Sequence, residues 1–588
     1  MPQQLCRCSF QSLPQITDTH TSLPPSPTLH FTAMMALRPA GVLSLSLLAV
    51  VGVVSAATAS SSSSMPSGFC FRRAFATTTR GSTLSSSSSS SSPSRSSARN
   101  PLTRHHRTLF LTPENQHAID EARRRQFRAS STALHASSSS SSQPSSLTFT
   151  TKDEYFAHLS SISDLPLGFK VGTSWISFTP QEANFPSRMN VTLIALDEPT
   201  DKFALAFTKN AFPGAPIRVG KQRKDQPLLQ AIVVNNKISN VCPGGGGGDG
   251  GVADAELVCA AVAKQLNLPS GNLVLPSSTG VIGWRLPFQA VIDAVPSVLK
   301  TMQSASILPA AAGIITTDRY PKIRASSIGG GKIVGIAKGA GMIEPNLATM
   351  LVYLLTDLAV PREVLREWLP EVVSGSFNCI SIDSDQSTSD TVVLLSSGKV
   401  PVSEKDYLQI KQSLISLTQK LAEDIVRNGE GTNHVIELKV SHAPSLEIAR
   451  ALGRQVINSP LLKCAIAGND PNVGRLAAAV GSYVGNQGLE KGLKLEKCRL
   501  LMGGKVVFKG GAFELDPEKE KFLVEHMKGA QLEPGPLTME SGAHIKFPPH
   551  ERNVMLEVDL GEEGGEELTL FGSDLTYAYV TENADYRS

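Results

Sequence analysis

The chain has 588 residues, of which 41% are hydrophobic and 18% charged, so it is too apolar to be disordered throughout. Its charge is uneven: residues 1–140 hold 13 Arg, no Lys and 4 acidic residues, whereas residues 141–588 hold 42 basic and 48 acidic residues. A mildly acidic body argues against a general nucleic-acid-binding protein, which would carry a basic stripe.

Residues 1–145 are predicted to be a targeting leader, disordered and without a fold of its own. Within it, residues 34–59 have the layout of a signal peptide, because one arginine precedes an uncharged apolar run at 41–57 and small residues follow. The run is short for a membrane span, so cleavage is favoured over a transmembrane anchor, which stays as the alternative. Residues 60–145 combine serine tracts and arginines with few acids, which is typical of organelle transit peptides.

These two segments together are similar to the bipartite leader of proteins that enter plastids bounded by extra membranes. The sequence therefore predicts a location in the plastid stroma, with the mitochondrion as the alternative. A start at Met34 or Met35 would open the signal-like segment better than Met1 does. No membrane segment is expected in the mature chain.

The body alternates strand and helix patterns, which predicts an α/β fold with several sheets. It becomes globular from Leu165 onward, and no internal repeat is evident. Strands are expected at 191–196, 203–207, 228–234, 313–317, 350–355, 379–382, 391–395, 435–440 and 461–466. Helices are expected at 253–266, 287–302, 362–373, 404–427, 445–457 and 474–483. The last hundred residues are expected to be rich in strands.

The body contains no nucleotide-binding or metal-binding motif. The glycine-rich loops 244–251 and 329–332 match neither GxxxxGK[ST] nor GxGxxG, and Ile333 stands where a hydroxyl would bind magnesium. Surface loops are therefore expected, and no nucleotide is predicted. The five body cysteines form no CxxC pair and no HExxH occurs, so buried free thiols and no metal site are expected.

The segment 338–350 has the most informative chemistry: Lys-Gly-Ala-Gly-Met-Ile-Glu-Pro-Asn-Leu-Ala-Thr-Met, running into an apolar strand. If the bond between Ala348 and Thr349 were cut, Thr349 would carry its own α-amine beside its hydroxyl. An α-amine with a pKa of about 8 can accept the hydroxyl proton, which turns the hydroxyl into a nucleophile. The glycines give the backbone room for such self-cleavage. By residue types alone, a threonine here is more simply explained by β-propensity.

This segment resembles the cleavage site of the ornithine acetyltransferases, also called glutamate N-acetyltransferases, of arginine biosynthesis. Further motifs support the resemblance over most of residues 165–588. They are Leu-Pro-Ser-Ser-Thr-Gly-Val-Ile-Gly at 275–283, Ile-Thr-Thr-Asp at 315–318, Asn-Gly-Glu-Gly at 428–431, Asn-Asp-Pro-Asn-Val-Gly-Arg at 469–475 and Asn-Ala-Asp-Tyr at 583–586. Six motifs in the family's order are far more specific than any one of them.

The resemblance implies a layered α-β-β-α sandwich whose precursor cuts itself into an α chain, 146–348, and a β chain, 349–588. Thr349 would then take the acetyl group from N2-acetyl-L-ornithine as an acetyl-threonine, and L-glutamate would collect it. An assembly of two α and two β chains is implied, with neither metal nor cofactor. Some members of the family also accept acetyl-CoA and make N-acetylglutamate, and the sequence leaves this open. No nucleic-acid partner is expected.

The resemblance also assigns roles to individual residues. Thr279 and Gly280 would form the oxyanion hole, with a hydroxyl and a backbone amide as the donors that a tetrahedral intermediate needs. Ala348 and Thr349 are the cleavage pair. Substrate binding is assigned to Thr317, Lys338, Thr349, Glu430, Asn583 and Ser588. Among these, Lys338 offers a cation for a carboxylate and Glu430 an anion for an amino group.

The sequence departs from the family pattern at a few positions. Arg319 and Arg587 stand where the family usually has Thr, Thr432 where it has Ala, and Val473 where it has Trp. The loop 244–251 also replaces a more regular element. The two arginines could add positive charge near the pocket, so substrate affinity is less certain than the reaction.

Two other functions stay open on the sequence. One is an N-terminal-nucleophile aminopeptidase of the same fold, which would pass the acyl group to water; Lys338, Glu430 and the C-terminal motif disfavour it. The other is a non-enzymatic binding remnant, which an intact bond before Thr349 would favour.

Overall fold

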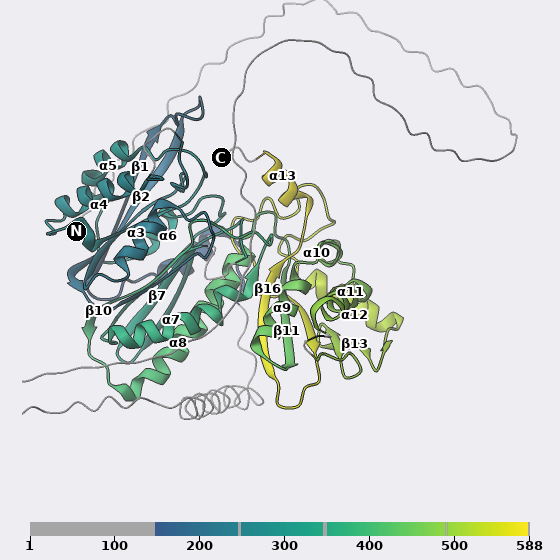
Figure 1. Ribbon diagram of the computed structural model, residues 1–588. Coiled ribbons are helices and arrows are strands. Elements are labelled where there is room, and N and C mark those ends of the chain that lie inside the picture. Colours follow the sequence, from purple (N-terminus) through teal and green to yellow (C-terminus); the bar gives the residue numbers. More distant parts are fainter. Residues whose placement is uncertain (1–146, 245–248, 345–349, 489, 491, 586–588) are drawn as a thin grey trace, which may run out of the picture. The chain divides into compact units, whose positions relative to one another are not determined.

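The computed structural model describes residues 147–588 except 245–248, 345–349, 489, 491 and 586–588 (Figure 1). The expected leader therefore lies outside the described residues. So do four residues singled out by the sequence, which are Ala348, Thr349, Arg587 and Ser588.

Two sheets packed face to face form the part of the molecule that carries most of the predicted site. The first has the strand order β1-β2-β4-β5 and the second the order β3-β10-β8-β7-β6. The strands of the first are β1 (Phe169–Phe178), β2 (Ser187–Thr200), β4 (Leu229–Asn235) and β5 (Val274–Ser278). Those of the second are β3 (Phe203–Phe207), β6 (Lys322–Ile328), β7 (Gly331–Lys338), β8 (Leu351–Leu358) and β10 (Thr391–Val400). Ile232 and Leu355, one from each sheet, are buried in the same cluster between them.

Helices cover the outer face of each sheet (Figure 1). They are α4 (Val252–Gln265) and α5 (Phe288–Lys300) on the first sheet, and α7 (Arg362–Ser374) and α8 (Tyr407–Arg427) on the second. Along β2, Leu193 faces the helices whereas Ile194 faces the other sheet, because side chains alternate along a strand. The predicted α/β class and the α-β-β-α sandwich are confirmed.

A third, mixed sheet has the order β14-β13-β12-β15-β11-β16-β9. Its strands are β9 (Ile380–Ser381), β11 (Val435–Ala443), β12 (Arg499–Met502), β13 (Lys505–Lys509), β14 (Ala512–Phe513), β15 (Val554–Asp559) and β16 (Glu566–Ser573). The helices of this region are α9 (Leu446–Ile457), α10 (Pro460–Ala467), α11 (Val473–Tyr483), α12 (Pro517–Ala530) and α13 (Tyr577–Asp585). Helix α12 lies in the last hundred residues, where mainly strands were expected. In the part of the chain that the structure describes, no helix combines the length and the apolar composition of a membrane span.

The strand expected at 461–466 is wrong, because this segment forms α10. The side chain of Ser459 accepts a hydrogen bond from the N–H of Leu462, and Pro460 occupies the first turn. A short apolar run fits a buried helix as well as a buried strand, so the Ser-Pro pair before it was the better signal.

The strand expected at 313–317 is also wrong. Helix α6 (Leu308–Gly313) ends there and a loop follows. The helix packs against β1 and β2 so closely that a Cβ on Gly313 would lie 2.3 Å from the Thr192 hydroxyl oxygen. The close packing of the small residues of α6 against β1 and β2 therefore explains why this segment is helical.

The five body cysteines are free thiols. Three of them are buried as expected, namely Cys259, Cys379 and Cys498, whereas Cys242 and Cys464 are exposed.

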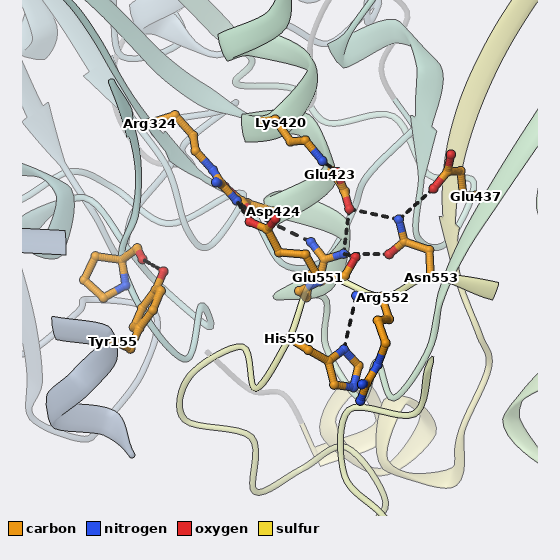
Figure 2. A network of polar contacts seen from close by, with 12 residues as sticks. Tyr155, Arg324, Lys420, Glu423, Asp424, Glu437, His550, Glu551, Arg552 and Asn553 are labelled. Atoms are coloured by element: carbon orange, nitrogen blue, oxygen red, sulfur yellow. Dashed lines mark hydrogen bonds and ion pairs between the residues drawn. The ribbon is translucent and has the colours of Figure 1, made fainter. Parts of the chain in front are cut away.

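A network of ion pairs connects the sandwich to the third sheet (Figure 2). Arg324 on β6 binds Asp424 on α8 with two nitrogens, each at 2.6 Å, and binds Glu551 at 2.7 Å. On the same helix, Arg427 donates to the Oδ1 of Asn553 at 2.6 Å. The bidentate pair fixes β6 against α8, because its geometry is well defined, and the contacts with Glu551 and Asn553 attach both elements to the segment before β15.

Residues 147–163 pack into the sandwich. Helix α2 (Lys152–Ser161) buries Tyr155 and Leu159, and the Tyr155 hydroxyl donates to the carbonyl of Pro321 at 2.8 Å. Leu159 is 1% exposed and belongs to the cluster between the two sheets. The expected start of the globular body at Leu165 is therefore too late, because α2 already packs into the core.

We expect Leu159→Ala to lower the free energy of unfolding by about 2–5 kcal/mol, because it leaves a cavity between the sheets. Leu167→Ala is the matched control: Leu167 is 61% exposed, so its truncation should cost at most about 0.5 kcal/mol. Urea unfolding of the two full-length variants checks this, and equal losses would show that α2 does not contribute to the core.

Candidate active site

Segments far apart in the sequence line one solvent-open cleft of about 770 Å³. Its lining includes every described residue to which the sequence assigned catalysis or binding: Thr279, Gly280, Thr317, Lys338, Glu430 and Asn583. Met350 and Leu351, which directly follow Thr349 in the chain, also line it. The predicted residues thus converge, whereas Ala348, Thr349 and Ser588 lie outside the described residues.

Thr279 and Gly280 follow β5 at the edge of the first sheet. The N–H of Thr279 donates to the carbonyl of Asn235 on β4 at 3.1 Å, which continues the parallel pairing of β4 with β5. Gly280 has a φ of 125°, and a Cβ there would lie 2.1 Å from the carbonyl carbon of Lys237. Only glycine fits this close approach, which turns the chain so that both residues face the cleft.

Lys338 ends β7, and acidic side chains surround it. The antiparallel pairing of β7 with β8 sets Lys338 opposite Leu351, two residues after Thr349. Burial lowers the pKa of Lys338, and the nearby carboxylates of Asp318 and Glu430 act in the opposite direction. A lysine cation held at this place suits a ligand carboxylate.

Asp318 supports Lys338 from within the protein. Its buried carboxylate pairs with the Lys322 ammonium and accepts the N–H of Gly339 at 2.8 Å and that of Thr316 at 3.1 Å. Burial alone would raise the pKa of Asp318, but Lys322 and Lys338 hold it below its usual range. The carboxylate therefore ties the Thr-Thr-Asp loop to the end of β7. Asp318 had no role assigned from its motif, although the lysine four residues later was a usable signal for this pair.

Glu430 and Asn583 meet across the cleft, although 153 positions separate them in the sequence. Asn583 Nδ2 donates to Glu430 Oε2 at 3.0 Å, and the N–H of Glu430 donates to the carbonyl of Ala340 at 2.8 Å. A Cβ on Gly341 would lie 2.3 Å from Glu430 Oε2, so only glycine lets the carboxylate lie against this turn. The Asn-Gly-Glu-Gly motif and the C-terminal motif thus build one subsite.

The departures from the family pattern are accommodated in different ways. The Arg319 guanidinium binds the carbonyl of Gly429 at 3.3 Å and the carboxylate of Glu582 on α13 at 2.7 Å, so its charge is balanced by that acid. Thr432 is buried, and its hydroxyl has no hydrogen-bond partner among the described residues. Val473 is buried in the core of the third sheet at the start of α11.

No described residue of the two glycine-rich loops lines the cleft. Gly329 and Gly330 form the left-handed turn of the hairpin of β6 and β7, and Lys332 pairs with Asp164 at 3.0 Å. In the other loop, the Asp249 carboxylate accepts two N–H groups at the start of α4, at 2.9 and 2.7 Å.

Comparison with known proteins gives consistent matches. Residues 179–588 match the sequence model of the ArgJ family. The chain is 40% identical over 278 residues to the arginine biosynthesis bifunctional protein ArgJ 2 of Clostridium acetobutylicum, which covers 47% of this chain and 70% of that protein. It is 33% identical over 450 residues to the mitochondrial arginine biosynthesis bifunctional protein ArgJ of Blastomyces gilchristii, covering 72% and 90% respectively. A solved structure of ArgJ from Bacillus halodurans is 28% identical, covers 40% of this chain and 98% of that chain, and has a TM-score of 0.33.

We expect Asp318→Asn to lower the free energy of unfolding by about 3–5 kcal/mol, because it leaves the buried Lys322 ammonium without its carboxylate. Asp197→Asn is the control, since it breaks the exposed ion pair with Lys170 and should cost at most about 1 kcal/mol. Urea unfolding at neutral pH measures both changes. The pKa of Asp318 is lowered in the folded chain, so its contribution is present above about pH 3.9, the value of a free aspartate, and is lost as the pH falls further. An Asp318→Asn loss no larger than that of Asp197→Asn would contradict the assigned role.

Proposed function

Because this chain belongs to the ArgJ family, the acyltransferases of arginine biosynthesis, we propose that it moves the acetyl group of N2-acetyl-L-ornithine to L-glutamate through an acetyl ester on Thr349. One observation carries the proposal. The residues assigned to the oxyanion hole, Thr279 and Gly280, line the same cleft as Lys338, the pair of Glu430 and Asn583, and the residues that directly follow Thr349.

The proposed chemistry begins with a cut in the chain's own backbone. The hydroxyl oxygen of Thr349 attacks the carbonyl carbon of Ala348, and the hydroxyl proton passes to the Thr349 nitrogen as the peptide bond breaks. Water then hydrolyses the ester, placing its oxygen on Ala348 as a carboxylate and returning a hydrogen to the Thr349 oxygen. The products are an α chain ending at Ala348 and a β chain beginning with a free amine.

Acetyl transfer then uses the same oxygen twice. The Thr349 amine accepts the hydroxyl proton, and the oxygen attacks the acetyl carbon while Thr279 and Gly280 donate hydrogen bonds to the negative oxygen. The proton moves to the leaving nitrogen, so ornithine departs as an amine. The amine of glutamate next attacks the ester, and its proton returns through the Thr349 amine to the hydroxyl.

The charged side chains in the cleft complement the α-carboxylate that both substrates share and the side-chain ammonium that only ornithine has. Both carry an α-carboxylate, which suits the Lys338 cation. Ornithine ends in an ammonium, for which the Glu430 carboxylate is the complement, with hydrogen bonds from Thr317, Asn583 and the terminal Ser588. These roles favour an amino acid as acceptor over water, and so favour the transferase over an aminopeptidase or a binding remnant.

The remaining parts of the proposal rest on the family and on the sequence. We include acetyl-CoA as a second acetyl donor because both curated relatives are named bifunctional. An assembly of two α and two β chains is included on the family resemblance. We propose that the leader directs the chain to the plastid, since a signal-like run precedes a Ser- and Arg-rich segment. The mitochondrion is the alternative, as the name of the Blastomyces gilchristii relative indicates for that protein.

We expect the purified protein to give two bands on a denaturing gel, with one fragment starting Thr-Met-Leu-Val on Edman degradation. Thr349→Ala should give one uncut band and no acetyl transfer, because it removes the only hydroxyl that the cut and the transfer share. Thr349→Ser keeps a hydroxyl beside the future amine and should still be cut. A Thr349→Ala protein that is cut, or that acetylates glutamate, would refute the mechanism.

We expect Gly280→Ala to lower kcat for acetyl transfer by about 100–1000-fold, because the added methyl collides with Lys237 and displaces the oxyanion donors. Gly283→Ala is the matched control: its φ is also positive, but a Cβ there has nothing within 4 Å. Steady-state kinetics of the two variants checks this. A Gly280→Ala protein as active as Gly283→Ala would show that the donors lie elsewhere.

A further inference from the structure

The chain that leads toward the proposed cleavage site contains a strained turn. Met342 has a φ of 56°, in the left-handed region that residues other than glycine rarely adopt. It is 41% exposed and lines the cleft, so packing of its own side chain does not explain the conformation. Such conformations persist only where neighbouring groups hold them, and they are common at functional sites.

One carboxylate holds this turn. Asp383 Oδ2 accepts the N–H of Met342 at 2.6 Å, and its Oδ1 accepts the N–H of Ile343 at 2.7 Å. Two consecutive N–H groups aimed at one carboxylate form a small anion-binding nest. Burial raises the pKa of Asp383, whereas these two hydrogen bonds lower it, so they favour the charged form.

Further hydrogen bonds join the residues after Met342 to the residues on either side of Asp383. The carbonyl of Ile343 accepts the N–H of Ile382 at 2.7 Å, and the N–H of Glu344 donates to the carbonyl of Asp385 at 2.9 Å. The Glu344 carboxylate in turn accepts the Ser381 hydroxyl at 3.1 Å. These backbone hydrogen bonds of residues 342–344 therefore all run to the segment 382–385, which contains Asp383, and they lie four residues or more before the predicted cut.

We propose that Asp383 is a positioning residue for self-processing, which holds the left-handed turn at Met342 and so aligns the chain entering the bond between Ala348 and Thr349. The inference rests on the proposed function, because it needs that bond to be cut. Asp383 is not among the described residues that line the cleft, and it acts through the backbone of residues 342 and 343.

The test follows the conversion of the full-length chain from one band to two after cell-free synthesis. Asp383→Asn replaces one acceptor oxygen by a donor group that faces an N–H, and it should slow conversion by about tenfold or more. Asp385→Asn is the matched control, because it makes the same chemical change at an exposed carboxylate. Asp385 contacts Glu344 and Asp383 through its backbone carbonyl and N–H, which the substitution keeps, so this variant should convert at the wild-type rate.

Rescue distinguishes positioning from a general loss of stability. Glycine adopts a φ of 56° without support, so Met342→Gly added to Asp383→Asn should restore conversion to within about threefold of wild type, whereas Met342→Ala should not. Met342→Val offers a second test should Asp383→Asn fail to fold. It keeps Asp383 and changes an exposed side chain, and it should slow conversion because β-branched residues tolerate this conformation worst.

The outcomes separate this inference from the proposed function. A wild-type chain that is never cut would refute the proposed function itself. If wild type is cut, the inference is overturned by Asp383→Asn converting at the wild-type rate, or by Met342→Gly failing to rescue it. If Asp383→Asn does not fold, the inference is overturned when the Met342→Val chain converts at the wild-type rate.

Discussion

The cleft depends on the buried carboxylate of Asp318. It carries a negative charge inside the protein because Lys322 pairs with it and Lys338 lies nearby, and an unpaired charge at this depth would be costly. The same carboxylate accepts the N–H of Gly339, so it fixes where β7 ends and the loop toward β8 begins. One interaction thereby sets both the charge environment of Lys338 in the cleft and the path of the chain as it leaves β7.

Sheet topology explains why the other residues that line the cleft lie close to the end of β7. β8 and β10 run parallel with Leu351 opposite Thr391, so the chain enters both strands at the same edge of the second sheet. The residues just before them, Met350 and Asp390, line the cleft. β5 belongs to the other sheet, and the face-to-face packing brings its end, with Thr279, to the same opening.

Helix α13 attaches to the rest of the site through polar contacts as well as through the buried Ala578 and the packing of Tyr579. On α13, Asn583 binds Glu430 and Glu582 binds Arg319, while the Tyr579 hydroxyl lies 3.4 Å from Asp383. Arg319 is a departure from the family pattern, yet its guanidinium serves this attachment. These contacts link α13 to three separate segments in or beside the cleft, so the position of the helix depends on all three.

Local patterns in the sequence were enough for many of the elements, whereas the site residues were predicted from the family resemblance, and those that the structure describes line one cleft. The strand 203–207 matches β3, and the helix expected at 445–457 matches α9, because hydrophobic period and capping are properties of neighbouring residues. Only the tertiary structure decided that α6 ends where a strand was expected at 313–317, that Glu430 meets Asn583, and that Asp383 accepts the N–H of Met342. The reason is physical: such partners are far apart in the chain or silent in the local pattern, and strand register and packing alone bring them within hydrogen-bonding distance.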